Sequence, residues 1–238
     1  MKPRRIGLLG GTFNPVHNGH LHIAGAVLRR LHLDSVLFIP VGIPPHKENQ
    51  EIAPAHHRMA MLRLALMGIP AFGSCDFEIK QAGPSFTINT LEALKSDYPK
   101  DHLYFIIGMD AFSQIKTWMK PERLLSLCNF VVLARPGYPF GSLPEFGPLL
   151  HIDRAALRQL DHGESKAYRF ETAARTRMHF LSIPPCEISG TEIRNRVKAG
   201  KGTKNRLPQS VMSYIIENKI YNEDNDFEGF KKASSQKK

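Results

Sequence analysis

The stretch GGTFNPVHNGH, at residues 10–20, carries more information about this chain than any other. It follows a short apolar run at 6–9 and precedes a helix-like spacing of apolar residues over 21–31. Glycines let the backbone turn tightly and approach a ligand closely. A strand, a glycine turn and a helix N-terminus together form an anion site, because free backbone N–H groups and the helix dipole both favour negative charge. We therefore expect a phosphate to bind at this turn.

Two histidines end the stretch and add chemistry to it. His17 and His20 are three residues apart and can share one side of a first helical turn. Each imidazole can donate a hydrogen bond to a phosphate oxygen. The pair therefore predicts a phosphate that reacts at this site as well as binding there. The alternatives are a metal-binding pair, for which the sequence nominates no third ligand, and plain polar surface. The spacing fits neither the GxGxxG dinucleotide fingerprint nor a P-loop.

Composition narrows the class of protein. The 238 residues suit one sizeable domain, with 42% hydrophobic and 23% charged residues. No apolar run approaches the roughly 18 residues of a membrane span, and the start MKPRRIGLLGG is too short in apolar residues for a signal peptide. We therefore expect a cytoplasmic protein with no membrane association. Cys75, Cys128 and Cys186 are odd in number and far apart, which predicts reduced thiols rather than disulfides or zinc ligands.

The formal charge of +10 indicates an anionic partner. Nucleic acid and a small polyanion such as a nucleoside triphosphate both fit. No aromatic-rich RNA platform accompanies the charge, so we expect small anionic ligands, a solvated basic surface and no nucleic acid.

Apolar runs alternate with amphipathic stretches along the chain. Most runs are continuously apolar, as parallel strands buried on both faces are. The pattern predicts an α/β fold, with a Rossmann-like doubly wound parallel sheet, ligands at the carboxyl ends of its strands, and a small C-terminal helical part. The expected strands are 5–9, 35–41, 72–79, 102–107, 129–134 and 178–183. The expected helices are 19–31, 54–67, 86–96, 110–118, 121–127, 190–199 and 208–218.

One domain is predicted over 1–222, with a Rossmann-like core at 1–185 and the helical part at 186–222. The polar segment 223–238 is expected to be a disordered tail. Residues 136–148 are too rich in Gly and Pro for regular structure, and residues 149–177 show a weak pattern with a possible helix near 153–161. The role of residues 140–177 stays open.

A second motif, ISGTEIR at 188–194, also begins a helix. Ser189 or Thr191 can cap that helix, Glu192 sits where the dipole favours an acid, and Arg194 extends from the first turn. Taken alone, the motif is better explained by a capped surface helix than by a binding site.

Together, GGxFxPxHxGH and the late ISxTxIR resemble the nucleotidyltransferase superfamily of adenylyl- and cytidylyltransferases. Within it, the chain is similar to the bacterial nicotinate-nucleotide adenylyltransferases. Further matches are IPPHK at 43–47, PSFTINTL at 84–91, FIIGMDAF at 105–112, TW at 117–118 and ARPGYP at 134–139, so that the resemblance runs from about Ile6 to Tyr221.

The resemblance implies a reaction between ATP and nicotinate mononucleotide. The mononucleotide 5′-phosphate attacks the α-phosphorus of ATP, giving the dinucleotide deamido-NAD and pyrophosphate. That phosphate is already ionised, so no general base is needed, and catalysis comes from positioning and charge stabilisation. Mg²⁺ is the expected companion of ATP, held mainly by phosphate oxygens and water.

The resemblance also implies residue roles. Catalysis falls to His17, His20, Thr12 and Arg194. ATP binding falls to Gly10, Gly11, Phe13, Gly108, Asp110, Ile188, Ser189 and Thr191. Mononucleotide binding falls to His46, Lys47, Thr87, Trp118 and Arg135. For four of these there is a plain alternative: a solvated loop for His46 and Lys47, core packing for Trp118 and a structural role for Arg135.

Other functions stay open at this point. The same chemistry on nicotinamide mononucleotide differs only in the loop that recognises the carboxylate, whereas PPHK, PSFT and Trp118 argue against phosphopantetheine. A class I synthetase fragment needs a KMSKS-like loop and an anticodon-binding region, which the sequence lacks. If the chain were only an RNA-binding module, the presence of both phosphate motifs would be a coincidence. A homo-oligomer is compatible with the sequence.

Overall fold

The computed structural model describes residues 2–43, 52–146, 150–184 and 186–221. Within these ranges the strands form one seven-stranded sheet in the order β3-β2-β1-β4-β5-β7-β6. Every neighbouring pair is parallel except β6 with β7. The strands are β1 (Arg5–Gly11), β2 (Ser35–Pro40), β3 (Phe72–Ser74), β4 (His102–Gly108), β5 (Asn129–Leu133), β6 (Ala167–Glu171) and β7 (Arg177–Leu181).

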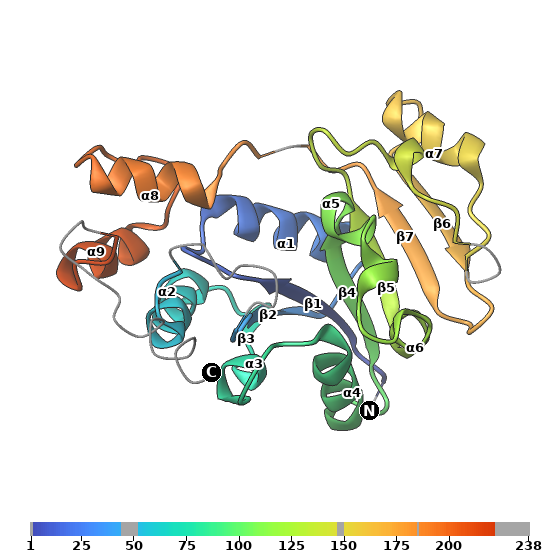
Figure 1. Cartoon of the computed structure of the whole chain (residues 1–238), viewed down its shortest axis with the longest axis horizontal. Helices are drawn as coiled ribbons and strands as arrows, with labels where there is room; N and C mark the ends of the chain where they lie inside the picture. Colours follow the sequence, from blue (N-terminus) through green and yellow to red (C-terminus); the bar gives the residue numbers. More distant parts are fainter. Residues whose placement is uncertain (1, 44–51, 147–149, 185, 222–238) are drawn as a thin grey trace, which may run out of the picture.

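Helices cover both faces of the sheet (Figure 1). One core cluster packs the sheet against α1 (Asn18–Arg30), α2 (Ala55–Leu66), α8 (Gly190–Lys198) and α9 (Gln209–Glu217). The other packs it against α4 (Thr87–Asp97), α5 (Met109–Phe112), α6 (Pro121–Leu127) and α7 (Arg154–Asp161). Short pieces are α3 (Phe77–Lys80) and the 3₁₀ turns η1 (Ile115–Thr117) and η2 (Phe140–Ser142). In Figure 1, α7 lies beside β6 and β7 at one end, and α8 and α9 at the other.

This arrangement confirms the predicted α/β class. β1 pairs with β2 on one side and β4 on the other, and the chain then winds outward in both directions. The reversal of strand order at β1 and β4 leaves a crevice beyond their carboxyl ends, where helices of the two layers diverge. The first motif follows β1 directly and therefore lies at this crevice.

The strand predicted at 72–79 is wrong beyond Ser74. The edge strand β3 ends there, and Phe77–Lys80 form the short helix α3. An edge strand has one neighbour for its backbone groups, so little holds the chain in the sheet. Glu78 turns inward instead, where it is buried and accepts a 2.8 Å hydrogen bond from Thr90 Oγ1.

The helix predicted at 110–118 is also wrong in its extent, because it divides into α5 and η1. Ser113 Oγ donates to the Asp110 carbonyl at 2.8 Å, and Thr117 Oγ1 donates to the Gln114 carbonyl at 2.8 Å. Such local bonds from short polar side chains compete with the regular helical ladder.

Between residues 150 and 176, which the structure describes, the weakly patterned region contains the helix α7 and the strand β6. Helix α7 agrees with the expectation near 153–161, and Asp153 caps it by accepting from Ala155 N at 2.8 Å. The edge strand β6 was not predicted, because its side chains alternate between exposed and half-buried positions beside only one neighbour.

Two further findings concern the cysteines and the lengths of the helices. Cys75, Cys128 and Cys186 are free, as predicted. No helix in the described ranges is long and apolar enough to cross a bilayer.

Candidate active site

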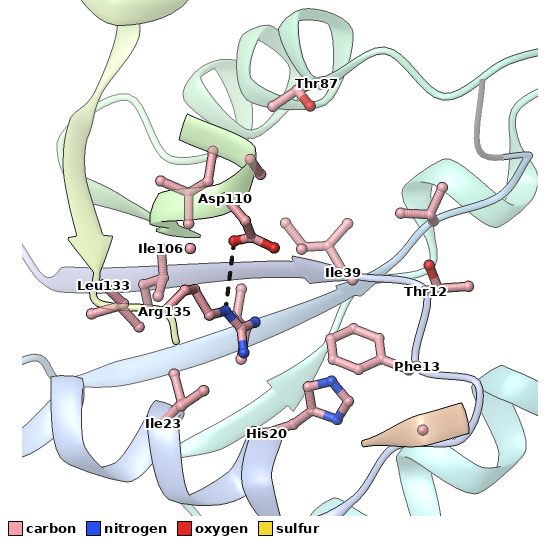
Figure 2. Close-up of a pocket in the computed structure, with 18 of the residues that line it drawn as sticks. Thr12, Phe13, His20, Ile23, Ile39, Thr87, Ile106, Asp110, Leu133 and Arg135 are labelled. Carbon is pink, nitrogen blue, oxygen red and sulfur yellow. Dashed lines mark ion pairs between the residues drawn. The ribbon is translucent and has the colours of Figure 1, made fainter. Parts of the chain in front are cut away.

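A cleft of about 880 Å³ opens at the carboxyl ends of β1, β4 and β5 (Figure 2). Its walls come from the first motif, the 85–88 segment, the ends of β4 and β5, and the start of α8. The volume is typical of a site for a nucleotide-sized ligand. Segments far apart in the sequence therefore meet at the edge where parallel strands end.

The first motif turns sharply away from the sheet. Phe13 has a left-handed backbone with φ +48°, and its side chain is only 2% exposed. The Phe13 ring meets the His20 ring edge-on, with centroids 4.9 Å apart. Asn14 Oδ1 accepts from Ala53 N at 3.0 Å and from the Tyr221 hydroxyl at 2.8 Å. The turn is thus held from behind by two distant segments.

His17 and His20 stack at the N-terminus of α1. Their ring centroids are 3.7 Å apart with an interplanar angle of 21°. The His17 backbone N–H donates to His20 Nδ1 at 3.2 Å, so a neutral His20 carries its proton on Nε2. His17 Nδ1 is buried and has no hydrogen-bond partner among the described residues. A buried polar atom without a partner is costly, and a ligand in the cleft is one way to satisfy it.

Both histidines are neutral at pH 7. Burial, assisted by the nearby Arg135 charge, lowers the pKa of His17 to about 4. Burial lowers the pKa of His20 well below its usual range, with smaller contributions from His17 and Arg135. The positive charge beside this pair is therefore that of Arg135. The two imidazoles act as neutral hydrogen-bonding groups.

The second motif contacts the first. Ser189 caps α8 by accepting from Glu192 N at 3.3 Å. Arg194 Nη1 donates to the Asn14 carbonyl at 2.8 Å, and Nη2 donates to Thr191 Oγ1 at 3.2 Å. The N-termini of α1 and α8 therefore share one cleft, and the positive ends of both helix dipoles lie at it.

The opposite wall is built at the ends of β4 and β5. Arg135 Nε lies 3.6 Å from Asp110 Oδ1. A Cβ on Gly108 would lie 2.3 Å from that Asp110 oxygen and 2.8 Å from Arg135 Nε, so a larger residue there would displace this ion pair. Figure 2 shows the Arg135 guanidinium between the Asp110 carboxylate and the His20 ring.

The cleft gathers most of the predicted site residues. Those that line it are Gly10, Gly11, Thr12, Phe13, His17, His20, Thr87, Gly108, Asp110, Trp118, Arg135, Ile188, Thr191 and Arg194. Ser189 is not among the lining residues and serves as the cap of α8. His46 and Lys47 lie outside the described residues.

Gly19 and Arg58 were not among the predicted site residues. A Cβ on Gly19 would lie 3.0 Å from His17 Nδ1, so this glycine makes room for the histidine ring. Its position between the two histidines was the available signal. Arg58 is 2% exposed and donates to backbone carbonyls of the motif turn and its neighbours. Arginines lie mostly at the surface of proteins, and the sequence carried no signal for the burial of this one.

In the described part of the chain, no three His, Cys, Asp or Glu side chains come together as a metal site. The metal-pair alternative for His17 and His20 therefore gains no third ligand from these residues. The arrangement instead suits polyphosphate chemistry, with two helix N-termini, two neutral imidazoles and two arginines facing one cleft.

Similarity to known proteins identifies the family of this chain. The cytidylyltransferase-like family matches residues 8–196. Fold and site thus define a nucleotidyltransferase of that family, to which the chain belongs.

Curated relatives narrow the assignment. A probable nicotinate-nucleotide adenylyltransferase of Desulfatibacillum aliphaticivorans is 40% identical over 225 residues, covering 91% of this chain and 99% of that protein. The nicotinate-nucleotide adenylyltransferase of Bacillus subtilis (strain 168) is 36% identical over 222 residues, covering 92% and 98%. The chain is therefore a member of the nicotinate-nucleotide adenylyltransferases.

A solved structure shares the fold. The Plasmodium falciparum nicotinic acid mononucleotide adenylyltransferase complexed with NaAD superposes with a TM-score of 0.66, at 17% identity and over 92% of this chain and 97% of that one.

Proposed function

We propose that this chain transfers the adenylyl group of ATP to nicotinate mononucleotide, giving nicotinate adenine dinucleotide and pyrophosphate. The observation that carries the proposal is the stacked, neutral pair His17 and His20 at the N-terminus of α1, with His17 Nδ1 buried and unpartnered among the described residues. Pyrophosphate release in such a site needs donors aimed at phosphate oxygens rather than a base.

The mononucleotide phosphate is the nucleophile in this scheme. It attacks the α-phosphorus of ATP in line, a new P–O bond forms, and the bond to the β-phosphate oxygen breaks. Because the phosphate is already ionised at neutral pH, no proton has to be removed. This fits two imidazoles that stay neutral, since burial lowers the pKa of both.

The surrounding groups would stabilise charge on the reacting phosphates. His17 and His20 would donate to the α- and β-phosphate region, and Thr12 would add a hydroxyl. Arg194 and the N-terminus of α8 would receive the triphosphate tail, as the contact between Arg194 and the first motif supports. Arg135 lowers the pKa of both histidines, so its charge would act on the same phosphates.

The adenosine and nicotinate ends would occupy opposite parts of the cleft. Asp110, beside Gly108 at the end of β4, would meet the adenosine ribose. Trp118 lines the cleft and would stack on the nicotinate ring. Thr87 begins α4 and also lines the cleft, and a helix N-terminus favours a carboxylate over a neutral amide. His46 and Lys47 remain predicted contacts of the mononucleotide phosphate.

Mg²⁺ would arrive with ATP and be held by phosphate oxygens and water. Two of the carboxylates at the cleft already have partners, since Glu78 accepts from Thr90 and Asp110 pairs with Arg135. When bound, the metal would withdraw charge from the departing pyrophosphate.

The test compares acceptors with wild-type protein and Mg·ATP. Pyrophosphate release and the mass of the product are measured with nicotinate mononucleotide, nicotinamide mononucleotide and phosphopantetheine. We expect a dinucleotide and stoichiometric pyrophosphate, with the highest kcat/KM for the nicotinate form. An equal or higher kcat/KM for the amide would overturn the choice of acceptor. No pyrophosphate with any acceptor would overturn the transfer reaction.

A further inference from the structure

Arg58 of α2 is a charged side chain buried behind the cleft. It is 2% exposed and is not among the described residues that line the cleft. Burial lowers its pKa, although an arginine keeps its charge in proteins. A buried cation is retained only where its donors are satisfied, so the partners of Arg58 indicate what the charge is for.

Four of the five N–H donors of Arg58 are accounted for by four backbone carbonyls. Nε donates to Ala53 O at 2.9 Å, and Nη2 donates to Gly42 O at 3.0 Å. Nη1 donates to Thr12 O at 2.9 Å and to Val41 O at 2.6 Å. The planar fork of a guanidinium suits several acceptors at fixed angles, which an ammonium cannot reproduce.

These carbonyls belong to two different walls of the site. Thr12 lies in the first motif, whereas Val41 and Gly42 follow β2 and lead toward the IPPHK segment. Arg58 therefore fixes the phosphate turn relative to the chain that leaves β2.

The chain at Gly42 also contacts residues other than Arg58. Gly42 N donates to Ser85 Oγ at 3.1 Å, and a Cβ on Gly42 would lie 2.1 Å from the Glu78 carbonyl oxygen. Burial raises the pKa of Glu78, and hydrogen bonds from Thr90, Ser85 and Gly42 oppose that rise. Ser85 lines the cleft and precedes Thr87 at the start of α4. The contacts thus run from the motif turn, through Arg58 and Gly42, to the nicotinate side.

We propose that Arg58 is a positioning residue that sets the two substrate sides of the cleft at the separation required for phosphate attack. The proposal deepens the proposed function and rests on it. Arg58 acts through the carbonyls of Thr12, Val41 and Gly42 and touches neither substrate. Its effect depends on the planar geometry of the guanidinium. A lysine at this position, which keeps the positive charge but not that geometry, is therefore not expected to replace it.

The test compares Arg58→Lys and Arg58→Met with Arg63→Met on the same helix. Arg63 is an exposed side chain whose ion pair with Asp76, at 3.7 Å, lies away from these contacts. Each variant is assayed below its own melting temperature for kcat and both KM values. Mononucleotide binding is followed through Trp118, the only tryptophan. Hydrogen exchange of peptides spanning 10–16 and 38–43 reports on the two turns without any substrate.

Both Arg58 variants are expected to lose about tenfold or more in kcat, because misplacing reacting groups by about 1 Å costs about 100-fold. Mononucleotide affinity should change less than kcat, and exchange should accelerate at 10–16 and 38–43. Arg63→Met should match wild type in all three measurements. Gly42→Ala provides a second test, since it moves the same turn while leaving Arg58 intact, and should also lower kcat.

Several results would overturn the proposal. If Arg58→Lys retains wild-type kcat and exchange, the fork geometry is not needed. If Arg58→Lys is active and Arg58→Met is not, Arg58 acts through its charge alone. If neither Arg58 variant folds, Arg58 is a folding residue and not a positioning one. Failure of the proposed function shows separately, as wild-type protein that releases no pyrophosphate, and leaves the exchange measurement able to decide on Arg58.

Discussion

Gly19 offers the sharpest test of the histidine pair. The residue lies in the first turn of α1, where a Cβ would sit 3.0 Å from His17 Nδ1 and 3.1 Å from its Cε1. Ordinary van der Waals contact begins near 3.4 Å, so in Gly19→Ala the ring must move by several tenths of an ångström. His20 stacks on the ring at 3.7 Å, and the displacement therefore passes to both imidazoles.

The expected kinetic loss follows from that displacement. A misplacement of about 1 Å can cost about 100-fold in rate, so a shift of roughly half that size predicts a loss of about tenfold in kcat. Stability should move little, because alanine is favoured over glycine in a helix by about 0.5–1 kcal/mol, which offsets the crowding. Gly19→Ala should therefore be stable but slow.

Gly25→Ala is the matched control on the same helix. Its Cβ would meet the flexible end of Arg29 at 3.3 Å and Phe72 at 3.9 Å, and no described atom of the cleft motifs. We expect wild-type kcat and a melting temperature raised by roughly 2–4 °C. Steady-state pyrophosphate release and thermal melts measure both variants. A Gly19→Ala protein with kcat within twofold of wild type would refute the claim that the His17 ring must occupy its present place.

Three further predictions concern the same cleft. His20→Ala should lower kcat by about 100-fold while the thermal melt stays cooperative, as loss of a transition-state donor does; unchanged kcat would remove His20 from catalysis. Trp118→Ala should raise chiefly the KM for the mononucleotide, whereas loss of the folded state would assign Trp118 to packing. The His17 ring should titrate near pH 4 by NMR, and Arg135→Gln should raise that pKa. Since unfolded histidine titrates near 6.5, the unfolded chain binds more protons between about pH 4 and 6.5, and the His17 contribution to stability falls as the pH drops through that window. A native His17 that titrates near 6.5 would contradict its burial.

Local patterns were sufficient for most of the fold. Continuous apolar runs predicted the central strands β1, β4 and β5, because strands buried on both faces need apolar side chains at every position. The failures lie at the edges of the sheet. β3 was predicted too long and β6 was not predicted, since an edge strand makes half as many backbone contacts and imposes a weaker pattern.

The sequence also placed both phosphate motifs at helix N-termini beside the carboxyl ends of strands, which follows from chain order alone. Their contact does not follow from chain order. Arg194 reaches the Asn14 carbonyl across 180 residues, which only the packing of α8 against the start of α1 brings about. Burial likewise decides that His17 and His20 are neutral, because a pKa depends on surroundings that no local pattern contains.

Arg58 shows the same division most clearly. Its place on a helix was predictable, whereas its burial and its four carbonyl partners depend on where β1, β2 and α2 converge in space. GGTFNPVHNGH therefore specified a phosphate turn with two histidines. The tertiary structure determined their protonation, the arginines that face them and the buried side chain that holds the turn, because desolvation and long-range hydrogen bonds exist only in the folded chain.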